Sequence, residues 1–179
     1  GKGINYKMSP ENAPCLAAAD IDICALANNH VIDWGYSGLE DTLETLKNLG
    51  IASAGAGRNS TEAEAPAILK TESGGRVIIV GLGMGSSGIP SEWKAERERP
   101  GVFRVNLLSA KDVLASIKTL VERIKRPDDV AVASIHWGAN WGYQVRRGHR
   151  RFACSLIDEA GIDLVHGHSS HHPKETDPK

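Results

Sequence analysis

The sequence has few cysteines, few aromatic residues and almost no net charge. Cys15, Cys24 and Cys154 are an odd number without CxxC spacing, so we expect small buried side chains rather than a disulfide framework. A formal net charge of −1 gives no indication of a nucleic-acid partner. No stretch is long and apolar enough to span a bilayer, and no signal peptide is visible at the start, so composition leaves the compartment open.

Length and composition are those of one globular domain. The chain has 179 residues, of which 41% are hydrophobic and 24% charged, and it is long enough to bury a substantial core. We therefore treat residues 1–179 as a single domain. The chain starts at Gly1 without an initiator Met and stops soon after a cluster of histidines, so we expect it to be truncated at both ends.

Apolar runs alternate with amphipathic stretches along the chain, and this order is typical of α/β proteins. A hairpin around Gly74-Gly75 adds an antiparallel pair, so we predict a mixed, parallel-rich sheet flanked by helices. The predicted strands are 20–27, 51–53, 66–71, 76–82, 102–105, 130–135 and 162–165. The predicted helices are 9–19, 37–50, 60–65, 91–98, 109–125 and 146–160.

Three of the predicted buried strands end in side chains that bind metals or phosphate. Asn28, Asn29, His30 and Asp33 follow strand 20–27. His136 and Trp137 follow strand 130–135, and four histidines lie within residues 166–172, after strand 162–165. The carboxyl ends of parallel strands meet at one edge of a sheet, where ligands bind. Three clusters far apart in sequence can therefore form one site.

Imidazole, amide oxygen and carboxylate together suit Zn, Fe and Mn. Two such ions about 3.5–4 Å apart can clamp the attacking and leaving oxygens of an in-line displacement. A single histidine of this kind is more often a hydrogen-bonded structural residue. Three clusters at three strand ends make that interpretation weaker.

The combination of motifs resembles a known family. Asn28-Asn29-His30, His136-Trp137-Gly138 and the Gly-His-x-x-His element at 167–171 look like the later motifs of calcineurin-like metallophosphoesterases. Asp33-x-Gly35 and Gly55-Ala56-Gly57 add a closer likeness to the bacterial capsule synthesis protein family CapA, which is associated with poly-γ-glutamate synthesis. Further matches are Gly38-Leu39, Thr42-Leu43, Leu46, Gly50-Ile51, Glu62-Ala63 and Ala65-Pro66.

This resemblance implies a metallophosphatase-like four-layer sandwich, which we expect to be incomplete in this chain, with two divalent ions, Mn, Fe or Zn. It makes Asn29, His136, His168 and His171 the metal ligands and His30 the catalytic residue that faces the substrate, with Asp33 fixing the loop or orienting His30. The implied role is in capsule or poly-γ-glutamate biosynthesis. Metal-activated water would act on an anionic substrate, a phosphoester or a polyglutamate-like chain, by hydrolysis or transfer.

The chain departs from the family at its start. The family begins with a strand that ends in an Asp-bearing motif, followed by an Asn-x-Glu motif, and neither has a match here. We expect both to lie upstream of Gly1, so this polypeptide alone would hold metal weakly. The resemblance is compatible with a cytoplasmic or an envelope-associated protein.

Candidate substrate contacts are Asn28, Arg58 and Trp137, although Arg58 also fits a surface position and Trp137 a packing role. His166 and His172 match no family motif. Four arginines between 146 and 151 are either a solvated helix face or a contact for an anionic polymer. A non-catalytic module that binds such a polymer is therefore the alternative to an enzyme. The glycine-rich loop 81–88 lacks a Walker ending, so we predict a mobile loop rather than a nucleotide site.

Overall fold

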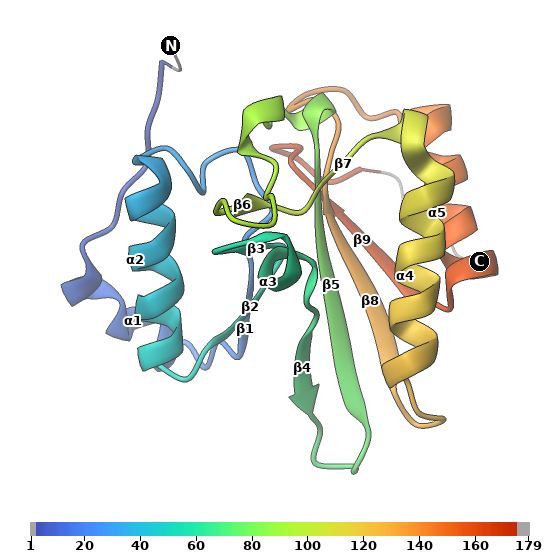
Figure 1. Ribbon diagram of the computed structural model, residues 1–179, viewed down its shortest axis with the longest axis horizontal. Helices are drawn as coiled ribbons and strands as arrows, with labels where there is room; N and C mark the ends of the chain where they lie inside the picture. Colours follow the sequence, from blue (N-terminus) through green and yellow to red (C-terminus); the bar gives the residue numbers. More distant parts are fainter. Residues whose placement is uncertain (1–2, 175–179) are drawn as a thin grey trace.

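The computed structural model describes residues 3–174, which build around a five-stranded mixed sheet (Figure 1). The strand order is β4-β5-β8-β9, with the two-residue strand β7 also paired to β5. β4 runs antiparallel to β5, and the other pairs are parallel. The bounds are β4 Ala67–Lys70, β5 Arg76–Met84, β7 Arg104–Val105, β8 Val130–His136 and β9 Leu164–His168.

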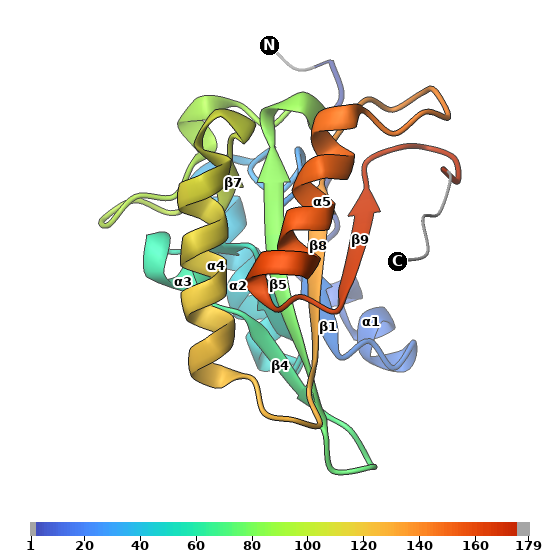
Figure 2. The ribbon, with the colours of Figure 1, turned by 90° about the vertical axis from the view of Figure 1, so that its right-hand side faces the viewer.

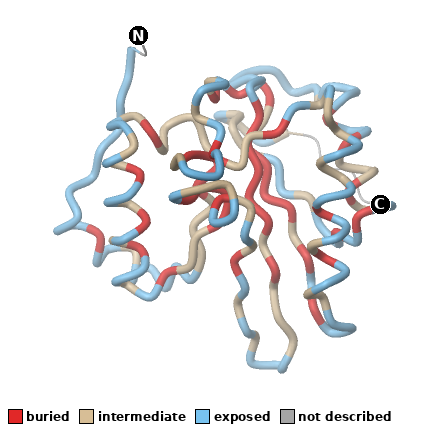
Figure 3. The backbone as a smooth tube through the Cα atoms, viewed as in Figure 1, coloured by how far each residue is buried: buried red, intermediate tan, exposed pale blue. Residues whose placement is uncertain are grey.

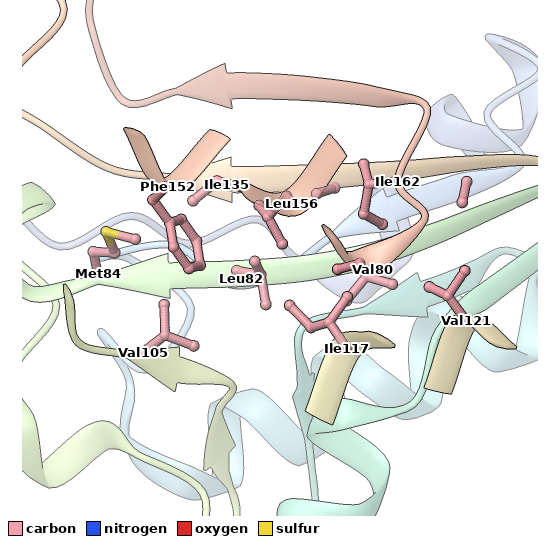
Figure 4. Packing of buried hydrophobic residues seen from close by; sticks show 13 residues of the cluster. Val80, Leu82, Met84, Val105, Ile117, Val121, Ile135, Phe152, Leu156 and Ile162 are labelled. Carbon is pink, nitrogen blue, oxygen red and sulfur yellow. The ribbon is translucent and has the colours of Figure 1, made fainter. Parts of the chain in front are cut away.

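Two amphipathic helices, α4 (Ala110–Ile124) and α5 (Arg147–Ala160), cover one face of this sheet (Figure 2). Successive side chains of a strand point to opposite faces, so alternate residues of β5 and β8 meet these helices. Figure 4 shows the resulting core, in which side chains from α4 and α5 pack on the strands. Its fully or nearly buried members include Val80, Leu82, Ile135, Ile117, Phe152 and Leu156.

A second, smaller layer of strands covers the other face of the sheet. β1 (Ile23–Ala25) and β2 (Ala52–Ala54) form a parallel pair, and β3 (Ala56–Gly57) pairs antiparallel with β6 (Gly101–Val102). Helix α2 (Gly35–Asn48) packs outside them through Leu39, Leu43 and Leu46 (Figure 1). The order of layers is therefore helix, strands, sheet, helix. The remaining helical elements are α1 Pro14–Ala18, α3 Ser60–Glu64, and the short 3-10 turns η1 Pro10–Asn12, η2 Gly85–Ser87, η3 Ser91–Trp93 and η4 Leu107–Ser109.

The two layers of strands touch where β5 carries glycine instead of a side chain. A Cβ atom at Gly81 would lie 2.7 Å from the carbonyl oxygen of Ala54, and one at Gly83 would lie 2.8 Å from that of Ala27. Stacked sheets normally lie about 10 Å apart, separated by side chains. Glycine at these positions lets the loop after β1 and the end of β2 lie directly against the second half of β5.

The predicted class, a mixed and parallel-rich α/β sheet flanked by helices, is confirmed. The hairpin is also confirmed, with Thr71–Gly75 as its turn. The predicted helix at 91–98 is wrong. Only η3 forms there, because Trp93 packs into the core beside α2 and Ala95 donates its N–H to the carbonyl of Val102. Tertiary pairing outweighs the helix propensity of this charged stretch.

The prediction of three buried histidine-bearing strands holds only for β8. Buried positions concentrate along β5 and β8 (Figure 3), whereas β1 is half-buried and β9 is exposed or half-buried throughout. β9 pairs with β8 along one side only, and Leu164 remains 50% exposed. An apolar run predicts a strand, but the sequence does not show what covers it. None of the helices in residues 3–174 is both long enough and apolar enough to cross a membrane.

Candidate functional site

The ends of β5, β8 and β9 meet at one edge of the sheet, and the loop after β1 reaches the same edge. The register places Gly83 opposite His136, and His136 opposite His168. The loop after β1 approaches through Asn29, because a Cβ atom at Gly88 would lie 3.4 Å from the Asn29 Nδ2 atom. Gly88 has a φ of +84°, which favours glycine on its own account.

Ser87 fixes the imidazole of His136, which is only 7% exposed. The Ser87 hydroxyl lies 2.8 Å from the carbonyl oxygens of Met84 and His136 and 2.7 Å from His136 Nδ1. A hydroxyl has one proton, and carbonyls can only accept. The hydroxyl therefore donates to a carbonyl, and His136 Nδ1–H donates to Ser87 Oγ. In this tautomer Nε2 carries the lone pair with which imidazole binds metals.

His168 lies beside His136, with ring centroids 5.1 Å apart in an edge-to-face arrangement. Its Nε2 atom is buried and has no hydrogen-bond partner among residues 3–174. Burial, and then the charge of His166, whose ring stacks at 5.3 Å, lower the pKa of His168 to about 4. The ring is therefore neutral at pH 7, as a metal ligand must be. An orphaned buried nitrogen normally costs free energy, so its presence points to a function.

The loop between β1 and α2 positions His30. The backbone N–H of His30 donates to Asn28 Oδ1 over 2.8 Å, and its Nδ1 lies 2.6 Å from Asp33 Oδ2. The Asp33 side chain is fully buried, whereas that of His30 is 33% exposed. Asp33 thus orients His30 through one nitrogen, and the partly exposed ring can meet a ligand.

The N-terminal segment packs on this loop. The backbone N–H of Tyr6 donates to Asp33 Oδ2 over 3.0 Å, and the Tyr6 ring meets the His30 ring edge-on at 4.5 Å. Trp34 Nε1–H donates to the Tyr6 carbonyl over 2.9 Å. Tyr6 therefore contacts both members of the His30–Asp33 pair.

Three further predicted site residues, His171, Trp137 and Arg58, have side-chain partners outside the His136–His168 pair. The His171 ring lies edge-on to Trp141 at 5.6 Å, and its backbone N–H donates to Asn140. Trp137 stacks on His149 at 4.7 Å and lies so close to Gly167 that a Cβ atom there would be 2.6 Å from Trp137 Nε1. Arg58 forms an ion pair with Glu62 at 3.6 Å.

The predicted metal site is thus represented by two adjacent imidazoles with Asn29 nearby, and these donors fit a divalent ion. Within the described part of the chain, no group of three or more His, Cys, Asp or Glu side chains is placed to hold one. The donors present are neutral, so carboxylates that would balance an ion's charge would have to come from elsewhere.

A cavity of about 780 Å³ lies beside β9, between the strand, α5 and the 139–146 loop; we call it the β9 cavity. Trp137 and Trp141 provide aromatic walls, and Arg146, Arg150 and Lys174 bring positive charge. His166 and His168 also line it. Burial, followed by the charges of Arg146 and Lys174, lowers the pKa of the buried His149 in its wall. This positive, aromatic cavity beside His168 suits an anionic ligand.

Two residues of the site have no motif in the sequence. Ser87 belongs to the glycine-rich loop, which is not the mobile loop we predicted, because Ser87 is buried and bonded to His136. The only indication of its role in the sequence is that a residue with a hydroxyl group lies among glycines directly after a buried strand. Tyr6 precedes the first predicted element, and nothing in its sequence surroundings indicates its contact with His30.

Comparison with known proteins adds an independent observation. The model of a family described as bacterial capsule synthesis protein PGA_cap matches residues 1–177. A probable polyglutamine synthesis accessory protein of Mycobacterium tuberculosis is 46% identical over 173 residues, which cover 97% of this chain and 45% of the relative.

Two further relatives are more distant. The capsule biosynthesis protein CapA of Bacillus anthracis is 27% identical over 171 residues, covering 95% of this chain and 39% of its own length. The PGA biosynthesis protein CapA of Bacillus subtilis is 26% identical over 171 residues, covering 95% and 42%. The chain spans less than half the length of each of these relatives.

Proposed function

Because the chain belongs to the PGA_cap family of bacterial capsule synthesis proteins, we propose that it carries the metal-binding edge of a CapA-like protein that assists polyglutamate capsule synthesis. The family has the metallophosphoesterase-like fold, and the order of layers in this chain agrees with it. The proposed chemistry is hydrolysis or group transfer on an anionic substrate, either a phosphoester or a polyglutamate-like chain.

The observation that carries this proposal is the His136–His168 pair. Ser87 holds the His136 ring beside His168, and the buried Nε2 of His168 has no hydrogen-bond partner among residues 3–174. Purely structural histidines would be expected to use both nitrogens in hydrogen bonds. When bound, divalent ions would supply an activated water and stabilise negative charge.

The protein's own groups would orient the substrate around this pair. His30, held by Asp33, is the candidate proton donor to a leaving group, since its second ring nitrogen lies on the partly exposed side chain. Arg146 and Arg150 of the β9 cavity would attract the anionic parts of the substrate. Asn28 would act indirectly, by holding the backbone of His30.

Metal titration of the purified chain tests the proposal. We expect Mn²⁺ or Zn²⁺ to bind, and His136→Ala and His168→Ala each to weaken binding at least tenfold. His172→Ala is the matched control, because that ring stacks on Trp141 instead. Equal affinity in all four proteins would overturn the metal site.

Turnover of a simple phosphoester separates binding from catalysis. Asp33→Asn should lower turnover at least tenfold and leave metal affinity unchanged, because Asp33 orients His30 and not the metal-binding rings. Asp22→Asn, an exposed carboxylate before β1, should change neither quantity.

A binding module without catalysis is the second candidate, and the positive β9 cavity favours it. Such a protein would bind polyglutamate through Arg146 and Arg150 but turn over no ester at any metal concentration. Arg146→Gln would then weaken polymer binding, and His136→Ala would leave it unchanged.

A further inference from the structure

A second cavity, of about 500 Å³, lies between the N-terminal segment and α2. We call it the α2 cavity. Tyr6, Lys7 and Met8 form one wall, and Ser37, Asp41 and Thr45 of α2 form the other. His30 and Asn28 also line it. Its volume is within the usual range of ligand pockets, about 300–1,000 Å³. It is therefore large enough for a ligand that also reaches His30.

The wall opposite α2 is held by hydrogen bonds to the loop between β1 and α2, which carries His30 and Asp33. Tyr6 donates its N–H to the Asp33 carboxylate that orients His30, and its carbonyl accepts from Trp34. The Tyr6 ring lies against His30 at 4.5 Å. A ligand held against this segment would therefore be positioned relative to His30.

The cavity has opposite charges at two places along α2. The Lys7 ammonium lies 4.9 Å from the centre of the Trp34 ring, just before α2 begins. Asp41 lies seven residues after Trp34, which at about 1.5 Å of rise per residue is about 10 Å further along the axis. The hydroxyls of Ser37, Thr42 and Thr45 also line the cavity. A complementary ligand carries a negative group near Lys7 and a positive group about 10 Å away.

We propose that the α2 cavity binds the amino end of a short acidic peptide, with the terminal ammonium at Asp41 and carboxylates at Lys7 beside His30. An extended α-linked peptide advances about 3.3–3.6 Å per residue, so the spacing corresponds to about three residues of such a peptide. The peptide chemistry rests on the proposed polyglutamate substrate, whereas the charges and spacing come from the cavity itself. The site would select the free end of a chain over its interior.

Calorimetric titration with triglutamate tests this proposal, and chelator in the buffer makes the result independent of any metal. Triglutamate with a free amino end should bind about five- to tenfold tighter than its N-acetylated form, because the ammonium pairs with Asp41. In Asp41→Asn the two peptides should bind alike. Glu44→Gln, an exposed change on α2 outside the cavity, should keep the preference.

Lys7→Gln should lower the affinity for both peptides by about the same factor, because it removes the cation that pairs with their carboxylates. Lys47→Gln is the control, because Lys47 is exposed on α2 and does not line the cavity. Equal binding of free and acetylated triglutamate to the unaltered protein, or an undiminished preference in Asp41→Asn, would overturn the proposal. If the metal titration showed no binding at His136 and His168, these peptide results would not change. The metal site and the peptide site can therefore be disproved independently.

Discussion

A single hydroxyl group holds several parts of the candidate site together. Ser87 is the last residue of η2, just after β5; it reaches His136 at the end of β8 and precedes Gly88, which adjoins Asn29. It is 5% exposed, so water cannot easily replace its hydrogen bonds. The orientation of the His136 ring therefore depends on a residue that would not itself contact a metal.

Replacing Ser87 by alanine should affect stability and metal binding together. The His136 Nδ1–H and one carbonyl lose a partner, so we expect a loss of about 1–3 kcal/mol in the free energy of unfolding, measured with urea. Metal affinity should fall about 10–100-fold, as for other residues that orient a ligand. Ser91→Ala, which removes an exposed hydroxyl, is the control. Unchanged metal affinity in Ser87→Ala would show that His136 needs no such support.

The glycines of β5 decide how closely two layers of elements approach. At Gly81 an added Cβ would meet backbone atoms of Ala54 and Gly55, at 2.7 and 2.9 Å, which cannot rotate away. Gly81→Ala should therefore lower the free energy of unfolding by about 1–3 kcal/mol through overpacking. Gly3→Ala should have little effect, because nothing lies near that position. Urea unfolding of both variants checks this, and a neutral Gly81→Ala would show that the layers can separate.

The elements differ in how well the sequence predicts them. Helices α2, α4 and α5 and the β4–β5 hairpin follow from apolar periodicity and from glycines at turns, which act locally. The helix prediction at 91–98 was wrong, and β1 and β9 are less buried than expected, because both features depend on partners distant in sequence. For the same reason, the histidines at strand ends could be predicted to gather at one edge, whereas the contacts of Ser87 and Tyr6 could not.

Across the whole molecule, one ion pair ties together elements from three regions of the chain. Arg76 at the start of β5 makes a bidentate pair with Asp129, just before β8, and also donates to the Ile124 carbonyl at the end of α4. The Asp129 side chain is 2% exposed. Hydrogen bonds from Arg76, and from the Arg126 backbone, lower the pKa of Asp129 to about 2, against an ordinary value of 3.8.

This shift predicts how stability depends on pH. A carboxylate with a lowered pKa stabilises the folded state fully above its unfolded pKa, and this contribution disappears as the pH falls toward the folded value. The unaltered protein should therefore lose stability between about pH 4 and pH 2. Asp129→Asn should be less stable at pH 7 and should lose less over that range. Thermal unfolding at several pH values measures the stability at pH 7 and its loss toward low pH. If stability fell equally with pH in the two proteins, the lowered pKa of Asp129 would be contradicted.

The sheet described above also has a consequence for the order of events during folding. β4 and β5 are joined by a five-residue turn, whereas β5 and β8, and β8 and β9, pair only after a long intervening segment closes into a loop. Short loops close faster, so the hairpin should form first. The segment between β8 and β9 is shorter than that between β5 and β8, so β8 and β9 should pair next and then dock together on β5. Pulse-labelled hydrogen exchange during refolding should protect the amides of Leu69 and Val77, which pair within the hairpin, before those of Ile135 and His168. His136 and His168 would then come together before β8 docks on β5, and the contact with Ser87 that orients His136 would form only at the end of folding.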